Sequence, residues 1–188
     1  MQPTGLSRPW NSTVVGVRRI SRTGSVRGAF EYRQAEEIRD VFARHAVRYL
    51  FIGKSGAIIL GYPDTTQDAD IFPERSPANG RALVAGLREL GFNLTDPEAS
   101  EIERGKDFVQ LKNGPFDLDL IFAPDGIERF SDAWQRRVMV EGFPVCHPDD
   151  IIASKVAANR AKDRESLDRL RSFREYWLRT RRDGQTDT

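Results

Sequence analysis

Apolar residues in the first half of the chain recur at two different spacings. In YRQAEEIRDVFARHAV (residues 32–47) they recur every three or four positions, which predicts an amphipathic helix. Its apolar face consists of Ala35, Ile38, Val41, Phe42 and Ala46. The shorter runs RYLFIG and DADIF are mostly apolar and are followed by glycine or proline turns, so they predict buried strands. Between them, SGAIIL predicts a short helix and GYPDTTQ predicts a loop.

The second half of the chain predicts a helix, a hairpin and a further strand before a helical end. Residues 78–91 (ANGRALVAGLRELG) have helical spacing and close on a glycine, a common helix end. DFVQLKN and GPFDLDLIFA predict a β-hairpin that turns at Asn113-Gly114. Residues 127–137 predict another helix, and VMVEGFPVC predicts one more strand. From Pro148 onward the spacing is helical, and the last helix has an apolar stripe of Leu167, Leu170, Phe173 and Trp177.

Together these elements predict a mixed α/β fold, in which a small mixed sheet is flanked by helices and followed by a helical C-terminal part. The predicted core spans residues 29–147 and the helical part spans residues 148–182. Residues 1–28 are rich in Gly, Ser, Thr, Pro and Arg, and they predict an extended arm in which only TVVGV has strand character. Residues 183–188 form a short tail.

The composition is that of one soluble globular domain. The chain has 188 residues, of which 39% are hydrophobic and 30% are charged, which is sufficient for a core. No apolar run reaches the roughly 20 residues that span a bilayer, and the N-terminus has no apolar signal segment. The single cysteine, Cys146, agrees with a reducing compartment. We therefore expect a cytoplasmic protein without a membrane partner.

The net charge of +1 is unevenly distributed. Residues 1–30 carry five arginines and no acid, and residues 160–182 carry nine basic and four acidic residues. Residues 31–159 are acidic overall. Basic flanks on an acidic body favour a polyanionic partner, although arginines that are simply solvated on helix surfaces explain the same counts.

Four aspartates mark the candidate chemistry. Asp68 and Asp70 lie one residue apart in DADIF, so their side chains point to the same face of a strand, and the same holds for Asp117 and Asp119 in DLDLIF. Carboxylates gathered in central strands repel each other unless a cation lies between them. Oxygen ligands suit Mg²⁺ or Mn²⁺. The pattern predicts a metal site of three carboxylates, in which either Asp117 or Asp119 is the third ligand.

The segment GKS after the first strand offers groups for phosphate. A P-loop is excluded, because the position five residues before Gly53, where that loop requires glycine, is Arg48. Gly53, Lys54 and Ser55 still provide backbone N–H groups, an ammonium group and a hydroxyl for a triphosphate. We therefore regard these three residues as candidates for nucleotide binding.

With these segments in view, the chain resembles the minimal nucleotidyltransferases of the DNA polymerase β superfamily, in particular the toxins of AbiE-type and MenAT-type toxin–antitoxin systems. FIGKSGAIILGYPDTTQDADIF resembles the family's glycine turn, short helix and D-x-D strand. LDLIF resembles the strand with the third acid, which would be Asp119, with Asp117 as the competing assignment. DDIIASKVAANRAKD resembles a helix whose lysine, here Lys155, contacts nucleotide phosphates, with Asp163 as a supporting acid. The resemblance covers residues 47–170.

The resemblance implies transfer of a nucleoside monophosphate from an NTP such as ATP or CTP, with a pyrimidine expected, to a hydroxyl group. Asp68, Asp70 and Asp119 would hold Mg²⁺ or Mn²⁺, and Lys155 would neutralise the terminal phosphates. In the MenT-type toxins the acceptor is the 3′ end of tRNA, and the added nucleotides block translation. A cognate antitoxin can silence such toxins by phosphorylating a residue just before the first aspartate. Here that residue would be Thr66, with Thr65 next.

Two positions depart from the family pattern, and two other functions fit the sequence. Lys54 replaces the second residue of the usual glycine turn, and Asp64 stands where a basic residue is frequent. A nucleotidyltransferase with a small-molecule acceptor, such as an aminoglycoside or lincosamide antibiotic, would suit the acidic body better than an RNA does. In the third interpretation the chain is a binding or regulatory module with a decayed catalytic site.

Overall fold

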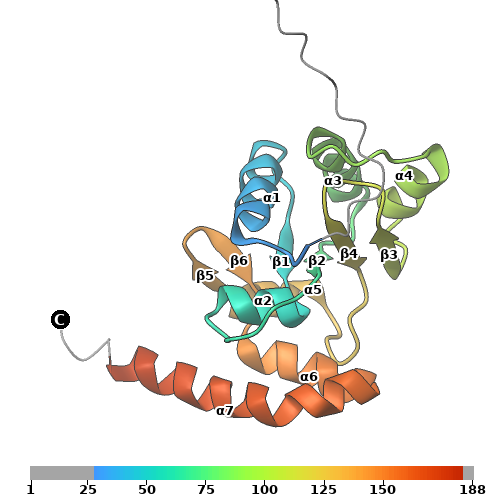
Figure 1. The fold of residues 1–188 in the computed structure, drawn as a ribbon. Helices are drawn as coiled ribbons and strands as arrows, with labels where there is room; N and C mark the ends of the chain where they lie inside the picture. Colours follow the sequence, from blue (N-terminus) through green and yellow to red (C-terminus); the bar gives the residue numbers. More distant parts are fainter. Residues whose placement is uncertain (1–27, 184–188) are drawn as a thin grey trace, which may run out of the picture.

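Residues 28–183, which the computed structural model describes, form seven helices and six strands (Figure 1). The helices are α1 (Tyr32–Arg44), α2 (Gly53–Ile59), α3 (Pro77–Glu89), α4 (Asp96–Glu103), α5 (Phe130–Arg136), α6 (Pro148–Ala158) and α7 (Ala161–Asp183). The strands are β1 (Tyr49–Phe51), β2 (Asp68–Pro73), β3 (Phe108–Leu111), β4 (Asp117–Ile121), β5 (Val138–Val140) and β6 (Phe143–Val145). The predicted arm strand TVVGV lies outside the described residues.

The six strands form one mixed sheet in the order β3-β4-β2-β1-β6-β5. The pairs β1–β6 and β2–β4 are parallel. The pair β1–β2 and both outer pairs, β3–β4 and β5–β6, are antiparallel. This sheet, with its helical C-terminal region, confirms the mixed α/β class expected from the sequence.

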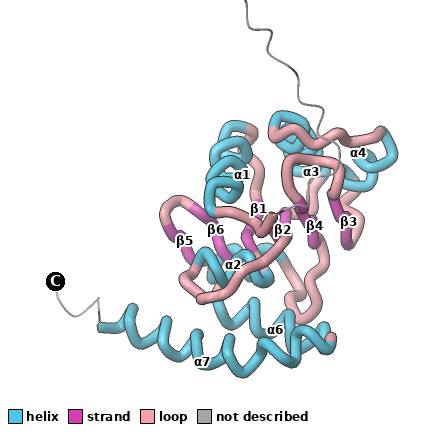
Figure 2. The backbone as a smooth tube through the Cα atoms, in the orientation of Figure 1, coloured by secondary structure: helices cyan, strands magenta, loops and turns pink. Residues whose placement is uncertain are grey.

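Helices cover both faces of the sheet. On one face, the ring of Phe42 in α1 meets Tyr49 of β1 edge to face, with ring centroids 5.0 Å apart. On the other face, Phe72 of β2 meets Phe130 of α5 with centroids 5.1 Å apart. α2 contacts β1, β2 and β6 as well as α6, on which the long α7 packs. In Figure 2, α6 and α7 lie together on the side of the molecule away from α1, α3 and α4.

Most apolar positions predicted from helical spacing are buried. They include Ala35, Ile38, Val41 and Phe42 in α1, and Leu167, Leu170 and Trp177 in α7. Ala46 is exposed instead, because α1 ends at Arg44 and Ala46 adopts a left-handed conformation (φ 53°) that turns the chain toward β1. Within the described range, no helix combines the length and the apolar character that a membrane crossing requires.

Three local predictions differ from the structure. VMVEGFPVC forms the hairpin β5–β6 rather than one strand, because Glu141 and Gly142 both take left-handed φ values (49° and 83°), as in two-residue hairpin turns. The β3–β4 hairpin is confirmed, but its loop comprises residues 112–116, longer than a two-residue turn at Asn113-Gly114. Helix α4 has no counterpart among the predicted elements, although Thr95 and Glu98 form a capping box at its start.

Candidate active site

Three carboxylates meet where the parallel strands β2 and β4 lie side by side. Asp68 is paired in register with Asp117, and Asp70 with Asp119, so all four side chains lie on one face of the sheet. Ligand oxygens of Asp68, Asp70 and Asp119 all lie within 4.8 Å of one another, and Asp117 is not part of this group. Of the two aspartates that the sequence leaves open, Asp119 is therefore the one that converges with the D-x-D pair.

The carboxylate cluster carries more negative charge than its surroundings balance. Asp119 is only 8% exposed, and it accepts a hydrogen bond of 3.1 Å from Nε2 of Gln110 on β3. Burial, and after it the charges of Asp68 and Asp119, raise the pKa of Asp70 to about 7. A backbone hydrogen bond from Ser55 and the charge of Lys155 act in the opposite direction without cancelling this rise. A bound cation would offset both the burial and the repulsion that raise the pKa of Asp70.

The start of α2 is built closely against Asp70. Gly53 has a left-handed φ of 61°, and a Cβ atom on it would lie 2.5 Å from Oδ2 of Asp70. Ser55 is buried, and its hydroxyl accepts the N–H of Asp70 at 2.9 Å and donates to the carbonyl of Ile52 at 3.2 Å. The hydroxyl that was expected to contact a triphosphate therefore holds the backbone of β2 in the protein interior. Only Gly53 and Lys54 of the GKS segment line the cavity described below.

Replacing Gly53 by alanine is expected to weaken Mn²⁺ binding about 10- to 100-fold, because the added methyl group would displace the Asp70 carboxylate. Isothermal titration with Mn²⁺ measures this change. Gly61→Ala is the matched control, since Gly61 also has a positive φ (103°) but nothing lies within 4 Å of the position of its Cβ. An equal loss of affinity in both variants would assign the effect to backbone strain and not to the contact with Asp70.

Lys155 is held at the site by a buried ion pair. Helix α6 ends at Asn159, whose left-handed conformation (φ 47°) turns the chain into α7. Asp163 is 1% exposed, and its carboxylate lies 3.1 Å from Nζ of Lys155 and 2.8 Å from Nε of Arg160. Burial raises the pKa of Asp163, but the hydrogen bonds from Arg160 and Lys155 outweigh it, so the pKa lies below its ordinary value. Asp163 therefore stays ionised and fixes the position of the Lys155 ammonium group.

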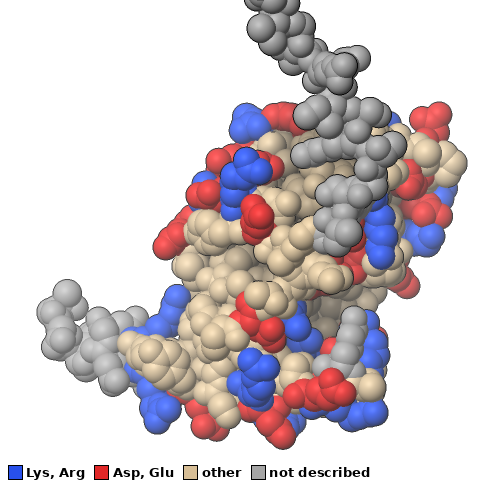
Figure 3. Space-filling view, in the orientation of Figure 1, with Lys and Arg blue, Asp and Glu red and all other residues tan. Residues whose placement is uncertain are grey.

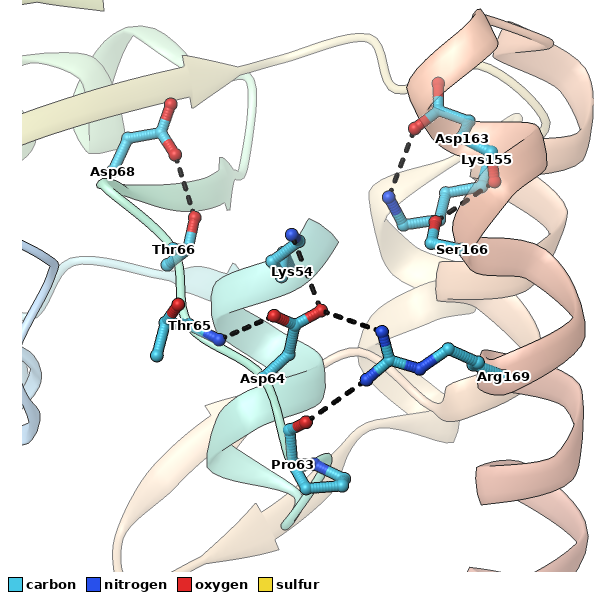
Figure 4. Close-up of polar contacts among 10 residues, drawn as sticks. All are labelled: Lys54, Pro63, Asp64, Thr65, Thr66, Asp68, Lys155, Asp163, Ser166 and Arg169. Carbon is cyan, nitrogen blue, oxygen red and sulfur yellow. Dashed lines mark hydrogen bonds and ion pairs between the residues drawn. The ribbon is translucent and has the colours of Figure 1, made fainter.

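The loop between α2 and β2 links the carboxylates to α7 (Figure 4). The hydroxyl of Thr66 donates a hydrogen bond of 3.0 Å to Oδ1 of Asp68. Asp64 lies between two cations, 3.5 Å from Nζ of Lys54 and 4.0 Å from a guanidinium nitrogen of Arg169. Asp64 is thus paired with Lys54, at the start of α2.

The carboxylate cluster, Lys155 and the loop before β2 face one cavity with a volume of about 980 Å³. Its walls include the three clustered carboxylates and three cations, which are Lys54, Lys155 and Arg160. A volume near the upper end of the usual range for ligand pockets, about 300–1,000 Å³, suits a nucleotide together with part of a second substrate. The candidate metal ligands and the candidate phosphate-binding groups therefore face the same space.

Neither the models of known protein families nor the curated proteins compared with this chain match it. The functional conclusion therefore depends on the site itself. Of the candidate residues from the sequence, those that line the cavity are Gly53, Lys54, Thr65, Thr66, Asp68, Asp70, Asp119, Lys155 and Asp163. The sequence patterns do not single out Gln110 and Phe108, which also line it. The alternation of apolar and polar residues in DFVQLKN is the signal that places both on one face of a strand.

Proposed function

We propose that the protein is a metal-dependent nucleotidyltransferase, which transfers a nucleoside monophosphate from an NTP to a hydroxyl group. The observation that carries this proposal is the convergence of three carboxylates, facing the same cavity as a lysine that a buried acid holds in place. The carboxylates favour a cation between them, and the ammonium groups of Lys155 and Lys54, although each is paired with an acid, face the same cavity and can bind an anion. A triphosphate with its divalent ion meets both requirements.

The donor atoms fit Mg²⁺ or Mn²⁺. Asp68, Asp70 and Asp119 offer only oxygen ligands, which these hard cations prefer, and their ligand atoms lie within 4.8 Å of one another. When bound, such ions neutralise charge on the phosphates and make the attacking hydroxyl more acidic. Gly53 leaves the space that Asp70 needs to take this position.

The other groups of the site have distinct roles in the transfer. Lys155 binds the β- and γ-phosphates as a point charge, held by Asp163, and Lys54 offers a second ammonium group. The acceptor oxygen forms a bond to the α-phosphorus. At the same time the bond between the α-phosphorus and the oxygen that bridges the α- and β-phosphates breaks. Pyrophosphate leaves, and the proton of the acceptor hydroxyl passes to a carboxylate oxygen of Asp119.

The proposed acceptor is the 3′ end of tRNA, with a pyrimidine nucleotide as the expected donor. The support comes from charge, because basic side chains gather along the lower edge of the molecule over α7, interspersed with acids (Figure 3). Arg171, Arg179 and Arg181 of this helix are exposed. Exposed arginines bind a phosphate backbone without reading its sequence. Nucleotides added to the tRNA terminus would block translation in the cytoplasm, which is the action of a toxin.

Control by an antitoxin would act through the loop before β2. Thr66 lines the cavity, and its hydroxyl is hydrogen-bonded to Asp68. A phosphate on this hydroxyl would replace the hydrogen bond with repulsion beside the carboxylate cluster and would occupy space needed by the triphosphate. Thr65, which is exposed on the same loop, is the second candidate for modification.

A small cationic acceptor is the alternative that a specific observation favours. Asp125 is exposed at the rim of the cavity, where it would attract the amino groups of a molecule such as an aminoglycoside, and Asp107, which is paired with Arg75, also lies at the rim. The carboxylates and Lys155 would have the same roles for this acceptor.

Incubation of the purified protein with total RNA and each α-³²P-labelled NTP, in Mg²⁺ or Mn²⁺, tests the proposal. We expect labelled RNA, and at least about 100-fold less label with Asp68→Asn, because one of the three ligands is lost. Replacing Arg171 and Arg179 by glutamate is expected to lower RNA labelling about 10-fold. The labelling that remains should depend less steeply on salt concentration, since fewer phosphate contacts remain.

The same assay separates the alternatives. Label on an aminoglycoside and none on RNA under any condition would reject the tRNA acceptor and retain the transferase. If Mn²⁺ binds no more tightly to the wild-type protein than to Asp68→Asn, and no acceptor is labelled, the protein is a module with a decayed site.

A further inference from the structure

Phe108 is the one aromatic residue among the described residues that line the cavity. Its side chain is 48% exposed, whereas Val109 and Leu111 on the same strand are buried. The ring makes no stacking or cation–π contact with another side chain of the described range. An exposed, unstacked ring on the wall of a polar cavity is unusual for a residue that serves only the core.

The position of this ring follows from the pairing of β3 with β4. Gln110 lies opposite Asp119, to which it donates a hydrogen bond, and Phe108 lies opposite Ile121. Because Phe108 and Gln110 are two residues apart, they point to the same face of the sheet as the carboxylates, and about 7 Å separates them along the strand. The ring is therefore next to the clustered acids, on the side of the outer strand β3.

The two sides of the cavity differ in chemistry. Its cations come from α2, from α6 and from the turn between α6 and α7. Along β3 and β4, Phe108 lies with Ile121 and with Asp107 at the rim, and the segment of Ala123, Pro124 and Asp125 continues from β4 toward α6, where Gly126 packs against Ala153. The triphosphate belongs to the side with the cations. The side with Phe108 is left for the second substrate.

We propose that Phe108 is a stacking platform for the terminal nucleobase of a single-stranded RNA acceptor, an inference that rests on the proposed function. The face of a base is planar and apolar, which matches the ring and its apolar neighbours. A base on this ring brings the terminal ribose toward Asp119. Asp107 is paired with Arg75, so the acid at the rim that repels phosphate is Asp125. Its charge favours the last nucleoside of a strand, which carries no 3′ phosphate, over an internal nucleotide. Stacking of this kind accepts any base at the terminus.

A short single-stranded RNA that ends in 2-aminopurine tests the platform, because the fluorescence of this base is quenched when it stacks. We expect quenching by the wild-type protein, loss of quenching with Phe108→Ala, and recovery with Phe108→Trp. In the transfer assay, Phe108→Ala is expected to raise the KM for RNA about 5- to 100-fold. Its affinity for Mn²⁺ together with an NTP should change less than about twofold.

Met139→Ala is the matched control, since Met139 is 52% exposed on β5, the opposite edge strand of the same sheet. It should affect neither quenching nor KM. Quenching that persists in Phe108→Ala, or a wild-type protein that does not quench, would overturn the platform. An equal loss of NTP affinity in Phe108→Ala would place the ring on the donor side and would also overturn it. Quenching without any transfer of label would reject the proposed transferase and retain the platform.

Discussion

Replacing Asp70 by asparagine is expected to stabilise the metal-free protein at pH 8 and to abolish its stabilisation by Mn²⁺. Transfer activity should fall about 1,000-fold, because the variant lacks a ligand at the centre of the carboxylate cluster. A substitution that removes function and increases stability indicates a group whose charge is unfavourable in the folded protein until its partner binds.

The direction of the effect follows from the pKa of Asp70. Its value in the folded, metal-free protein is raised from 3.8 to about 7. Between these two values the folded state binds more protons than the unfolded state, so the stability of the metal-free protein falls as the pH rises through this window. Above pH 7 the full penalty is present. The shift corresponds to at most about 4 kcal/mol, and we expect about 2 kcal/mol because the cavity is open to water. Asparagine carries no charge and avoids the penalty.

Urea denaturation at pH 5 and pH 8, with and without Mn²⁺, measures this prediction. The gain in unfolding free energy of Asp70→Asn should be large at pH 8 and small at pH 5. Asp117→Asn is the control, since Asp117 lies on the same face of the sheet but outside the ligand group. A variant that is less stable than wild type at pH 8 without metal would show that Asp70 is not under charge repulsion.

Replacing Asp163 by alanine is expected to destabilise the protein by about 3 kcal/mol. Asp163 is the buried partner of Lys155, whose side chain is only 13% exposed, so its loss leaves an ammonium group partly buried without its carboxylate. Arg160 is 64% exposed and can return to water at little cost. Because Lys155 also loses its anchor, the affinity for an NTP should fall about 10-fold or more.

A second substitution distinguishes the lost ion pair from a simple packing defect. If the unpaired ammonium is responsible, adding Lys155→Met to Asp163→Ala should restore much of the lost unfolding free energy, as measured with urea. Asp168→Ala serves as the control on the same helix, because Asp168 pairs with Arg171 at the surface and should contribute less than about 1 kcal/mol. A double variant no more stable than Asp163→Ala would assign the loss to packing.

Local chemistry made the first half of the site predictable. The alternation of side chains along DADIF places Asp68 and Asp70 on one face, and the structure has them there. The choice between Asp117 and Asp119 depends on how β4 is aligned with β2, which no single segment encodes. A second alignment, that of β3 with β4, brings Gln110 to Asp119, and nothing in the uncharged pair of Phe108 and Gln110 marks them as part of a site.

The backbone conformation determines two features that the sequence pattern does not reveal. Ser55 looks like a phosphate ligand in sequence, but the left-handed turn at Gly53 directs α2 so that the serine hydroxyl meets the backbone of β2. The dipeptide Glu141-Gly142 forms a hairpin turn with two positive φ angles. Because a glutamate rarely takes a positive φ, the sequence VMVEGFPVC does not indicate this turn and has the pattern of one strand. Both outcomes depend on φ angles that the residue types do not make obvious.

The position of β1 in the sheet has a consequence for synthesis of the chain on the ribosome. One neighbour of β1 is β2, which follows shortly, but its parallel neighbour β6 contributes Val145 opposite Phe51. One side of β1 in the nascent polypeptide therefore stays without its parallel partner until the segment around Val145 has been translated. All three acids are made by residue 119, whereas Lys155 emerges only with α6. During elongation the clustered acids are therefore present before the lysine that faces the same cavity.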